Sequence, residues 1–116
     1  VIPGSANSMR LETRTPGADA NPYLAIAAAL ASGLYGIEHK LELPAAVTGA
    51  DVGAESTQRL PRTLAEATEA LDRSALAREL LGDQFVTHFV QTRRWEVRRF
   101  NEAVTDWELQ RYLEMV

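Results

Sequence analysis

Three charged residues alternate with uncharged ones near the start of the sequence: Arg10, Glu12 and Arg14. In a β-strand, residues two apart point to the same face and lie roughly 6.5–7 Å apart, so these side chains would project together. A carboxylate supplies hard oxygen to a divalent cation such as Mg²⁺, and guanidinium groups hold phosphate oxygens in forked hydrogen bonds. Such groups stabilise the charge on a phosphoryl group in transfer. The pattern predicts part of a metal–nucleotide site, but alternating charges also occur on solvent-facing strands that bind nothing.

The elements on either side of this segment are predicted by local signals. The alternation over residues 9–15 predicts a strand, which a Pro-Gly turn ends. Asn21-Pro22 predicts the start of a helix over about 22–40, because asparagine caps free amides and proline suits the first helical position. This helix is apolar on nearly every side, so we expect protein to cover it all round. Its nearly uncharged apolar run, Pro22 to Ile37, is shorter than the roughly 20 residues that span a bilayer and is rich in alanine and glycine.

The rest of the sequence predicts helices after a long connection. Residues 41–62 contain proline and glycine and show no periodicity, which indicates a loop of unusual length. Residues 63–116 contain apolar stripes at helical spacing and predict three or four helices. The predicted fold class is therefore mainly α with one or two short strands. The helix boundaries are marked by Thr63 with Glu66, by Ser74, by Gly82, and by Thr105 with Glu108.

Composition narrows the partners that the chain is expected to have. The formal net charge of the 116 residues is -4, which disfavours nucleic acid and anionic membranes as partners. There is no cysteine, so disulfides and thiolate metal sites are excluded. His39 and His88 lie far apart, which favours structural roles for both. A basic stretch of the predicted helices contains Arg93, Arg94, Arg98 and Arg99, with Glu96 and Glu102 among them. We interpret it as a solvated or subunit-contacting helix face.

Several short motifs follow the Arg-x-Glu-x-Arg segment in a fixed order. They are Asn21-Pro22-Tyr23-Leu24, Gly33-Leu34-Tyr35-Gly36, Leu60-Pro61, Leu81-Gly82 and Thr105-Asp106-Trp107-Glu108. In this order and spacing, the chain resembles the C-terminal part of the catalytic domain of glutamine synthetases. The resemblance covers essentially the whole chain, and the ordered set is far more specific than any one motif.

The resemblance implies both a fold and an activity. Residues 1–116 would form the C-terminal segment of an α+β catalytic domain. The enzyme would be an ATP-dependent glutamate–ammonia or glutamate–amine ligase that acts through a gamma-glutamyl phosphate, with ATP and Mg²⁺ or Mn²⁺ as cofactors. At the matching positions, Glu12 would bind a metal ion and Arg10 would lie against the ATP phosphates. Arg14 would bind the glutamate carboxylate that is phosphorylated.

The family's other metal ligands and its nucleotide-base pocket lie upstream of the matching segment. We therefore expect the chain to be inactive alone and to need the remainder of the catalytic domain, in a cytoplasmic homo-oligomer whose neighbouring subunits share sites. Pro-Gly-Ala-Asp and the Trp107-Glu108 pair resemble divergent members, some of which ligate glutamate to polyamines or other amines. The amine acceptor stays open. The alternative is a non-catalytic helical interaction module derived from such a domain.

Overall fold

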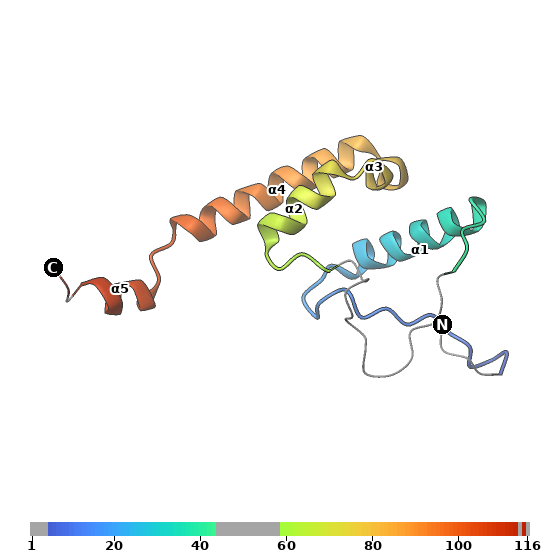
Figure 1. Ribbon diagram of the computed structural model, residues 1–116, viewed down its shortest axis with the longest axis horizontal. Coiled ribbons are helices and arrows are strands. Elements are labelled where there is room, and N and C mark those ends of the chain that lie inside the picture. Colours follow the sequence, from blue (N-terminus) through green and yellow to red (C-terminus); the bar gives the residue numbers. More distant parts are fainter. Residues whose placement is uncertain (1–4, 44–58, 114, 116) are drawn as a thin grey trace. The chain divides into compact units, whose positions relative to one another are not determined.

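The computed structural model describes residues 5–43, 59–113 and 115, and most of the predicted loop over 41–62 lies outside them. The described part is mainly helical, which confirms the predicted fold class (Figure 1). Within it, none of the helices combines the length and the hydropathy needed to cross a membrane. The helices are α1 (Pro22–Glu38), α2 (Leu64–Arg73), α3 (Ala75–Leu81), α4 (Asp83–Glu102) and α5 (Asp106–Tyr112).

The chain divides into two compact units, Val1–Leu41 and Glu42–Val116. In the first unit, α1 begins where the sequence signals place it. The Asn21 side chain accepts hydrogen bonds from the backbone N–H groups of Tyr23 (3.0 Å) and Leu24 (3.3 Å), so two of the free amides of the first turn are satisfied.

The end of α1 at Glu38, rather than near residue 40, has a specific cause. Lys40 takes a positive φ of 51°, and its N–H donates to the carbonyl of Ile37 (3.2 Å). The N–H of Leu41 donates to the carbonyl of Gly36 (3.0 Å). This pair of bonds is a Schellman motif, in which the left-handed residue is usually glycine. Because lysine rather than glycine stands at this position, the sequence does not signal that the helix ends here.

The strand predicted over 9–15 does not form as a continuous element among the described residues. In this range only Arg10 makes a β-bridge, and residues 11–15 are irregular. The alternation of side chains indicates a strand, but a strand becomes regular only when a neighbour completes its ladder of backbone hydrogen bonds. The prediction is therefore corrected to an irregular segment with one bridging residue.

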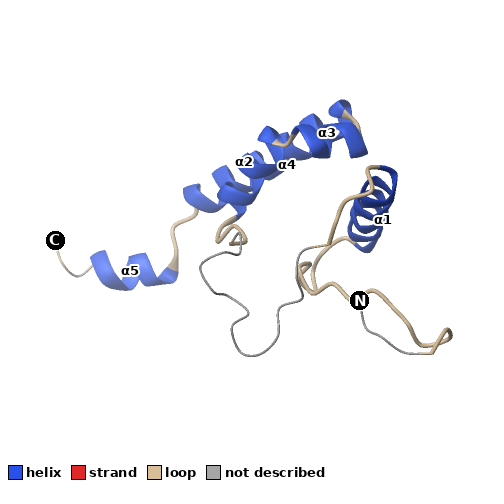
Figure 2. Cartoon of the chain, turned by 45° about the vertical axis from the view of Figure 1, so that its right-hand side comes forward, coloured by secondary structure: helices blue, strands red, loops and turns tan. Residues whose placement is uncertain are grey.

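In the second unit, α2 and α3 both pack against α4 (Figures 1 and 2). The apolar core of the described residues is small. Val86 and Val90 of α4 are 0% and 1% exposed, and Thr68 of α2 is buried with them. The Thr68 hydroxyl donates to the carbonyl of Leu64 (2.6 Å), so its burial leaves no unpaired donor.

The helix junctions of the second unit follow the predicted caps closely. The Ser74 hydroxyl accepts from the N–H of Ala77 (3.1 Å) and begins α3. Gly82 ends α3 with φ 88° and ψ 137°, a conformation that residues with a Cβ rarely adopt, and α4 begins at the next residue. The direct junction between α3 and α4 therefore depends on this glycine.

The two predicted capping boxes have different outcomes. At α5, Thr105 accepts from the N–H of Glu108 (3.3 Å) and the Glu108 carboxylate accepts from the N–H of Thr105 (2.8 Å), so this box is confirmed. At α2, Thr63 accepts from the N–H of Glu66 (3.1 Å). The Glu66 carboxylate instead accepts from the N–H of Arg62 (2.8 Å), one residue before the cap. At α2, therefore, the hydrogen bond to the Thr63 hydroxyl forms, and the reciprocal bond from the N–H of Thr63 to Glu66 does not.

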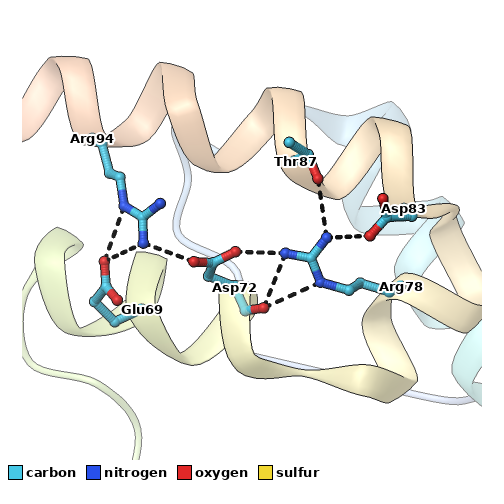
Figure 3. A network of polar contacts seen from close by, with 6 residues as sticks. All are labelled: Glu69, Asp72, Arg78, Asp83, Thr87 and Arg94. Carbon is cyan, nitrogen blue, oxygen red and sulfur yellow. Dashed lines mark hydrogen bonds and ion pairs between the residues drawn. The ribbon is translucent and has the colours of Figure 1, made fainter.

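Charged side chains also connect the helices of the second unit, as Figure 3 shows. Arg94 of α4 donates to Glu69 (2.7 and 3.0 Å) and to Asp72 (2.7 Å) of α2. Arg78 of α3 donates to the other carboxylate oxygen of Asp72 (2.5 Å) and to its backbone carbonyl (3.1 and 3.2 Å). Asp72 is therefore the residue through which all three helices are linked.

The same Arg78 side chain also reaches the first turn of α4. One of its terminal nitrogens contacts the carboxylate of Asp83 and donates to the Thr87 hydroxyl (3.0 Å). A forked guanidinium is well suited to this task, because it presents several donors in fixed directions. Arg78 and Arg94 together hold α2 and α3 against α4 by charge-assisted hydrogen bonds.

Replacement of Asp72 by asparagine tests this link through its pH dependence. Hydrogen bonding from Arg94, opposed by desolvation and aided by the charges of Arg94 and Arg78, lowers the pKa of Asp72. A carboxylate with a lowered folded-state pKa contributes stability above its unfolded pKa, and that contribution is lost as the pH falls through the folded value. We expect Asp72→Asn to reduce the free energy of unfolding near neutral pH and to differ less from the wild type below about pH 4. Denaturant unfolding followed by circular dichroism measures this.

Asp83→Asn is the matched control for that experiment. The Asp83 carboxylate is far more exposed than that of Asp72 and, among the described residues, pairs with Arg78 alone, so its loss should destabilise the unit less than the loss of Asp72. An equal deficit for Asp72→Asn at every pH would contradict the assigned role of the Asp72 charge.

Candidate metal and nucleotide site

The structure brings Arg10, Glu12 and Arg14 together. One carboxylate oxygen of Glu12, Oε1, accepts from Nε (2.8 Å) and Nη2 (2.6 Å) of Arg14. The other oxygen, Oε2, lies 3.7 Å from Nη2 of Arg10. The carboxylate therefore lies between two guanidinium groups, and we call these three residues the Arg–Glu–Arg cluster.

The cluster lies on a segment without a regular strand, and a turn flanks the segment on each side. Before it, the N–H groups of Ser8 and Met9 donate to the carbonyl of Ser5 (2.8 and 3.0 Å). After it, the N–H of Ala20 donates to the carbonyl of Gly17 (3.1 Å), directly ahead of the cap of α1. Contacts between residues two apart along this short segment are then sufficient to group the charges.

Exposure and charge distinguish the members of the cluster. The side chain of Glu12 is 32% exposed, while those of Arg10 and Arg14 are 61% and 88% exposed. Two positive charges and one negative charge leave a net charge of +1. Exposed ion pairs contribute at most about 1 kcal/mol to folding, so the cluster adds little to stability. Its arrangement leaves the arginines open to an anionic ligand.

The residues present fit one part of a metal site. The 3.7 Å contact from Arg10 is too long for a direct hydrogen bond, so Oε2 of Glu12 keeps lone pairs that a cation could use. Among the described residues, no three histidine, cysteine, aspartate or glutamate side chains are grouped closely enough to hold a metal ion. Glu12 therefore fits as a single ligand, and a full coordination sphere needs oxygens from elsewhere.

Two other predictions concern residues outside the cluster. His39 is the C-cap of α1, stacks on Tyr35 with ring centroids 3.8 Å apart, and has its Nδ1 3.0 Å from the carbonyl of Tyr35, in agreement with the structural role predicted for it. Arg94, assigned to a solvated or subunit-contacting face, instead turns toward α2. Its partners Glu69 and Asp72 lie 25 and 22 residues earlier, so no local pattern could have revealed them.

The sequence matches the family described as "Glutamine synthetase, catalytic domain" over residues 1–112. The chain belongs to the glutamine synthetase catalytic-domain family. This confirms the resemblance that the ordered motifs carry. No solved structure gave a significant match to the chain.

Three relatives from this family cover nearly the whole chain. It is 52% identical to type-1 glutamine synthetase 2 of Dictyostelium discoideum over 120 residues, which is 100% of this chain. It is 45% identical to gamma-glutamylethanolamide synthetase GlnA4 of Streptomyces coelicolor over 97% of this chain, and 42% identical to the glutamate–isopropylamine ligase of a Pseudomonas species over 100%. The alignments cover 23%, 24% and 26% of those relatives, so the chain spans about a quarter of their length.

Proposed function

We propose that this chain supplies the Arg10–Glu12–Arg14 part of the active site of an ATP-dependent ligase that joins glutamate to ammonia or to an amine. The observation that carries the proposal is the placement of the Glu12 carboxylate between two open guanidinium groups, in a chain of the glutamine synthetase catalytic-domain family. The composition of the cluster matches the need for one hard oxygen ligand flanked by two groups that bind anionic oxygens.

The proposed reaction has two steps. A carboxylate oxygen of the glutamate side chain attacks the terminal phosphorus of ATP, the bond to ADP breaks, and an acyl phosphate forms. The amine nitrogen then attacks the acyl carbon, loses a proton, and expels inorganic phosphate as the amide forms. Both steps move negative charge between oxygens, so fixed positive charges that need no reorganisation lower the barriers.

Each member of the cluster has a role in this scheme. Glu12 would contribute one oxygen to a bound Mg²⁺ or Mn²⁺, which when bound neutralises charge on the phosphates. Arg10 would hold the ATP phosphates. Arg14 would bind the glutamate carboxylate and then the phosphoryl group in transit, since a guanidinium pairs with planar carboxylates and phosphates through two parallel hydrogen bonds.

The net charge of the cluster favours one form of the ligand. A net charge of +1 repels a free divalent cation, whereas it attracts a metal–nucleotide complex, which is an anion. Arg10 and Arg14 would then exchange part of their contact with Glu12 for phosphate oxygens as the complex enters. We therefore propose that metal reaches this cluster together with the nucleotide.

The acceptor and the partners are proposed from the relatives. Two of them are named as a gamma-glutamylethanolamide synthetase and a glutamate–isopropylamine ligase, and the third as a glutamine synthetase. We propose ammonia or a small amine as the acceptor. The remaining metal ligands and the nucleotide-base pocket would come from the remainder of the catalytic domain, within a cytoplasmic homo-oligomer.

The isolated chain of 116 residues should show no ATP- and glutamate-dependent amide synthesis above background. The reason is that Glu12 alone cannot complete a metal site within the described residues. Phosphate release measured with glutamate, ATP, Mg²⁺ and either ammonia or ethanolamine tests this. Measurable turnover would contradict the proposed division of the site. If a catalytic domain that contains the chain is also inactive, the helical interaction module becomes the better account.

Glu12→Ala should impair catalysis far more than Glu66→Ala in a complete domain. A suitable domain is the Dictyostelium type-1 glutamine synthetase 2 with its aligned quarter replaced by this chain, referred to below as the chimera. Loss of a ligand charge at a metal site typically costs several kcal/mol, and the metal concentration needed for half-maximal rate should rise. Glu66 supports only the start of α2, so its loss should cost about 1 kcal/mol of stability and leave metal dependence unchanged. Equal effects of the two substitutions on metal dependence would contradict the assignment of Glu12 as a metal ligand.

A further inference from the structure

The two oxygens of the Glu12 carboxylate have different contacts. Oε1 accepts hydrogen bonds from both Nε (2.8 Å) and Nη2 (2.6 Å) of Arg14, which lie along one side of the guanidinium group. Among the residues that the structure describes, Oε2 has one longer contact, 3.7 Å to Nη2 of Arg10. Holding Arg14 and binding a cation are therefore tasks that separate oxygens of the same carboxylate can perform.

The guanidinium group of Arg14 keeps an open edge in this arrangement. A guanidinium group has five N–H donors in one plane. The Nε hydrogen and one hydrogen of Nη2 are directed at Glu12, so the other hydrogen of Nη2 and both hydrogens of Nη1 remain. The Nη1–Nη2 edge offers the two parallel donors that bind a carboxylate or a phosphate. Arg14 can therefore pair with Glu12 and with an anionic ligand at the same time.

Glu12 supplies the contact that orients Arg14. The Arg14 side chain is 88% exposed, and within the described part of the chain its ion-pair partner is Glu12. An exposed arginine samples many rotamers, and this freedom is lost when a ligand fixes the side chain. Two hydrogen bonds to one oxygen remove part of that freedom before the ligand arrives, which improves binding by preorganisation.

We infer that Glu12 is a positioning residue for Arg14 in addition to its role as a metal ligand. Oε1 holds the guanidinium group so that its Nη1–Nη2 edge faces the glutamate carboxylate, while Oε2 is left for the metal ion. The inference rests on the roles that the proposed function gives to both residues. It adds that loss of Glu12 weakens glutamate binding even when metal is not limiting.

Charge alone predicts the opposite result. Removal of the Glu12 charge raises the net charge of the Arg–Glu–Arg cluster from +1 to +2, and a more positive cluster attracts glutamate more strongly. Glu12→Gln and Glu12→Ala have the same effect on charge. The side-chain oxygen of glutamine can still accept from Arg14, whereas alanine has no acceptor. A comparison of these two variants therefore isolates the positioning effect.

Calorimetric titration of the chimera with glutamate tests the inference. Mg²⁺ and a non-hydrolysable ATP analogue are held at concentrations that saturate each variant, so that binding is measured without turnover. We expect Glu12→Ala to bind glutamate about tenfold more weakly than Glu12→Gln, the size expected when a hydrogen bond to a charged group is lost. Equal binding by the two variants, or tighter binding by Glu12→Ala, would overturn the inference.

The same pair of variants in an Arg14→Lys background is the matched control. Lysine keeps the positive charge but has no forked edge for Glu12 to orient, so the difference between the pair should shrink to less than about twofold. A difference that persists would show that the glutamine acts through the metal ion, and it would overturn the inference.

Crystal structures of the two variant chimeras provide a second measurement. In Glu12→Gln, Nε of Arg14 should still donate to the glutamine oxygen. An Arg14 side chain that keeps the same orientation in Glu12→Ala would show that other residues position it, and would overturn the inference.

The Mn²⁺ concentration needed for half-maximal binding to the same variants separates this inference from the proposed function. Altered metal binding together with equal glutamate binding by Glu12→Ala and Glu12→Gln would reject the positioning role alone. Unaltered metal binding together with the expected difference in glutamate binding would reject the metal role alone. A chimera that binds no glutamate would reject both.

Discussion

Scarcity of apolar burial is the constraint on which the rest of the structure depends. Among the described residues, Val86 and Val90 are the apolar side chains that are fully removed from water. A domain of ordinary stability offsets the loss of chain entropy mainly by apolar burial. In the second unit, charge-assisted hydrogen bonds through Asp72 perform part of that task and fix three helices relative to one another. Among the described residues of the first unit, no side chain of α1 is buried.

The Arg–Glu–Arg cluster is open for a related reason. Its three side chains satisfy one another in part, but they lie on an exposed irregular segment and leave the arginines accessible. In a complete catalytic domain, surrounding residues would exclude water and strengthen every electrostatic contact in the cluster.

The features that the sequence predicted correctly depend on neighbours within a few residues. The caps at Asn21, Ser74 and Thr105 involve bonds that span two or three residues, and the grouping of Glu12 with Arg14 spans two. The prediction of a regular strand over 9–15 was wrong, because a strand needs backbone hydrogen bonds to a neighbouring strand, and local alternation of side chains does not provide one.

Other features could not be read from local patterns. Arg94 pairs across more than 20 residues, so its role depends on how α2 packs on α4. Lys40 has a left-handed backbone conformation at the end of α1, a position where glycine is the usual residue and marks the helix end in a sequence. For the candidate site, residue types and spacing identified the cluster, whereas the other ligands of a metal ion lie beyond what this sequence can specify.

The central claim is that Glu12 ligates the metal of a bound metal–nucleotide complex while Arg10 and Arg14 hold its anionic oxygens. A crystal structure of the chimera with Mn²⁺ and a non-hydrolysable ATP analogue tests it directly, because the anomalous signal of manganese locates the ion. The account predicts a Glu12 carboxylate oxygen within about 2.0–2.3 Å of the ion, as expected for a hard oxygen ligand, and both guanidinium groups at hydrogen-bond distance from phosphate oxygens. A Glu12 side chain that still pairs only with Arg14, with the ion bound elsewhere, would contradict it.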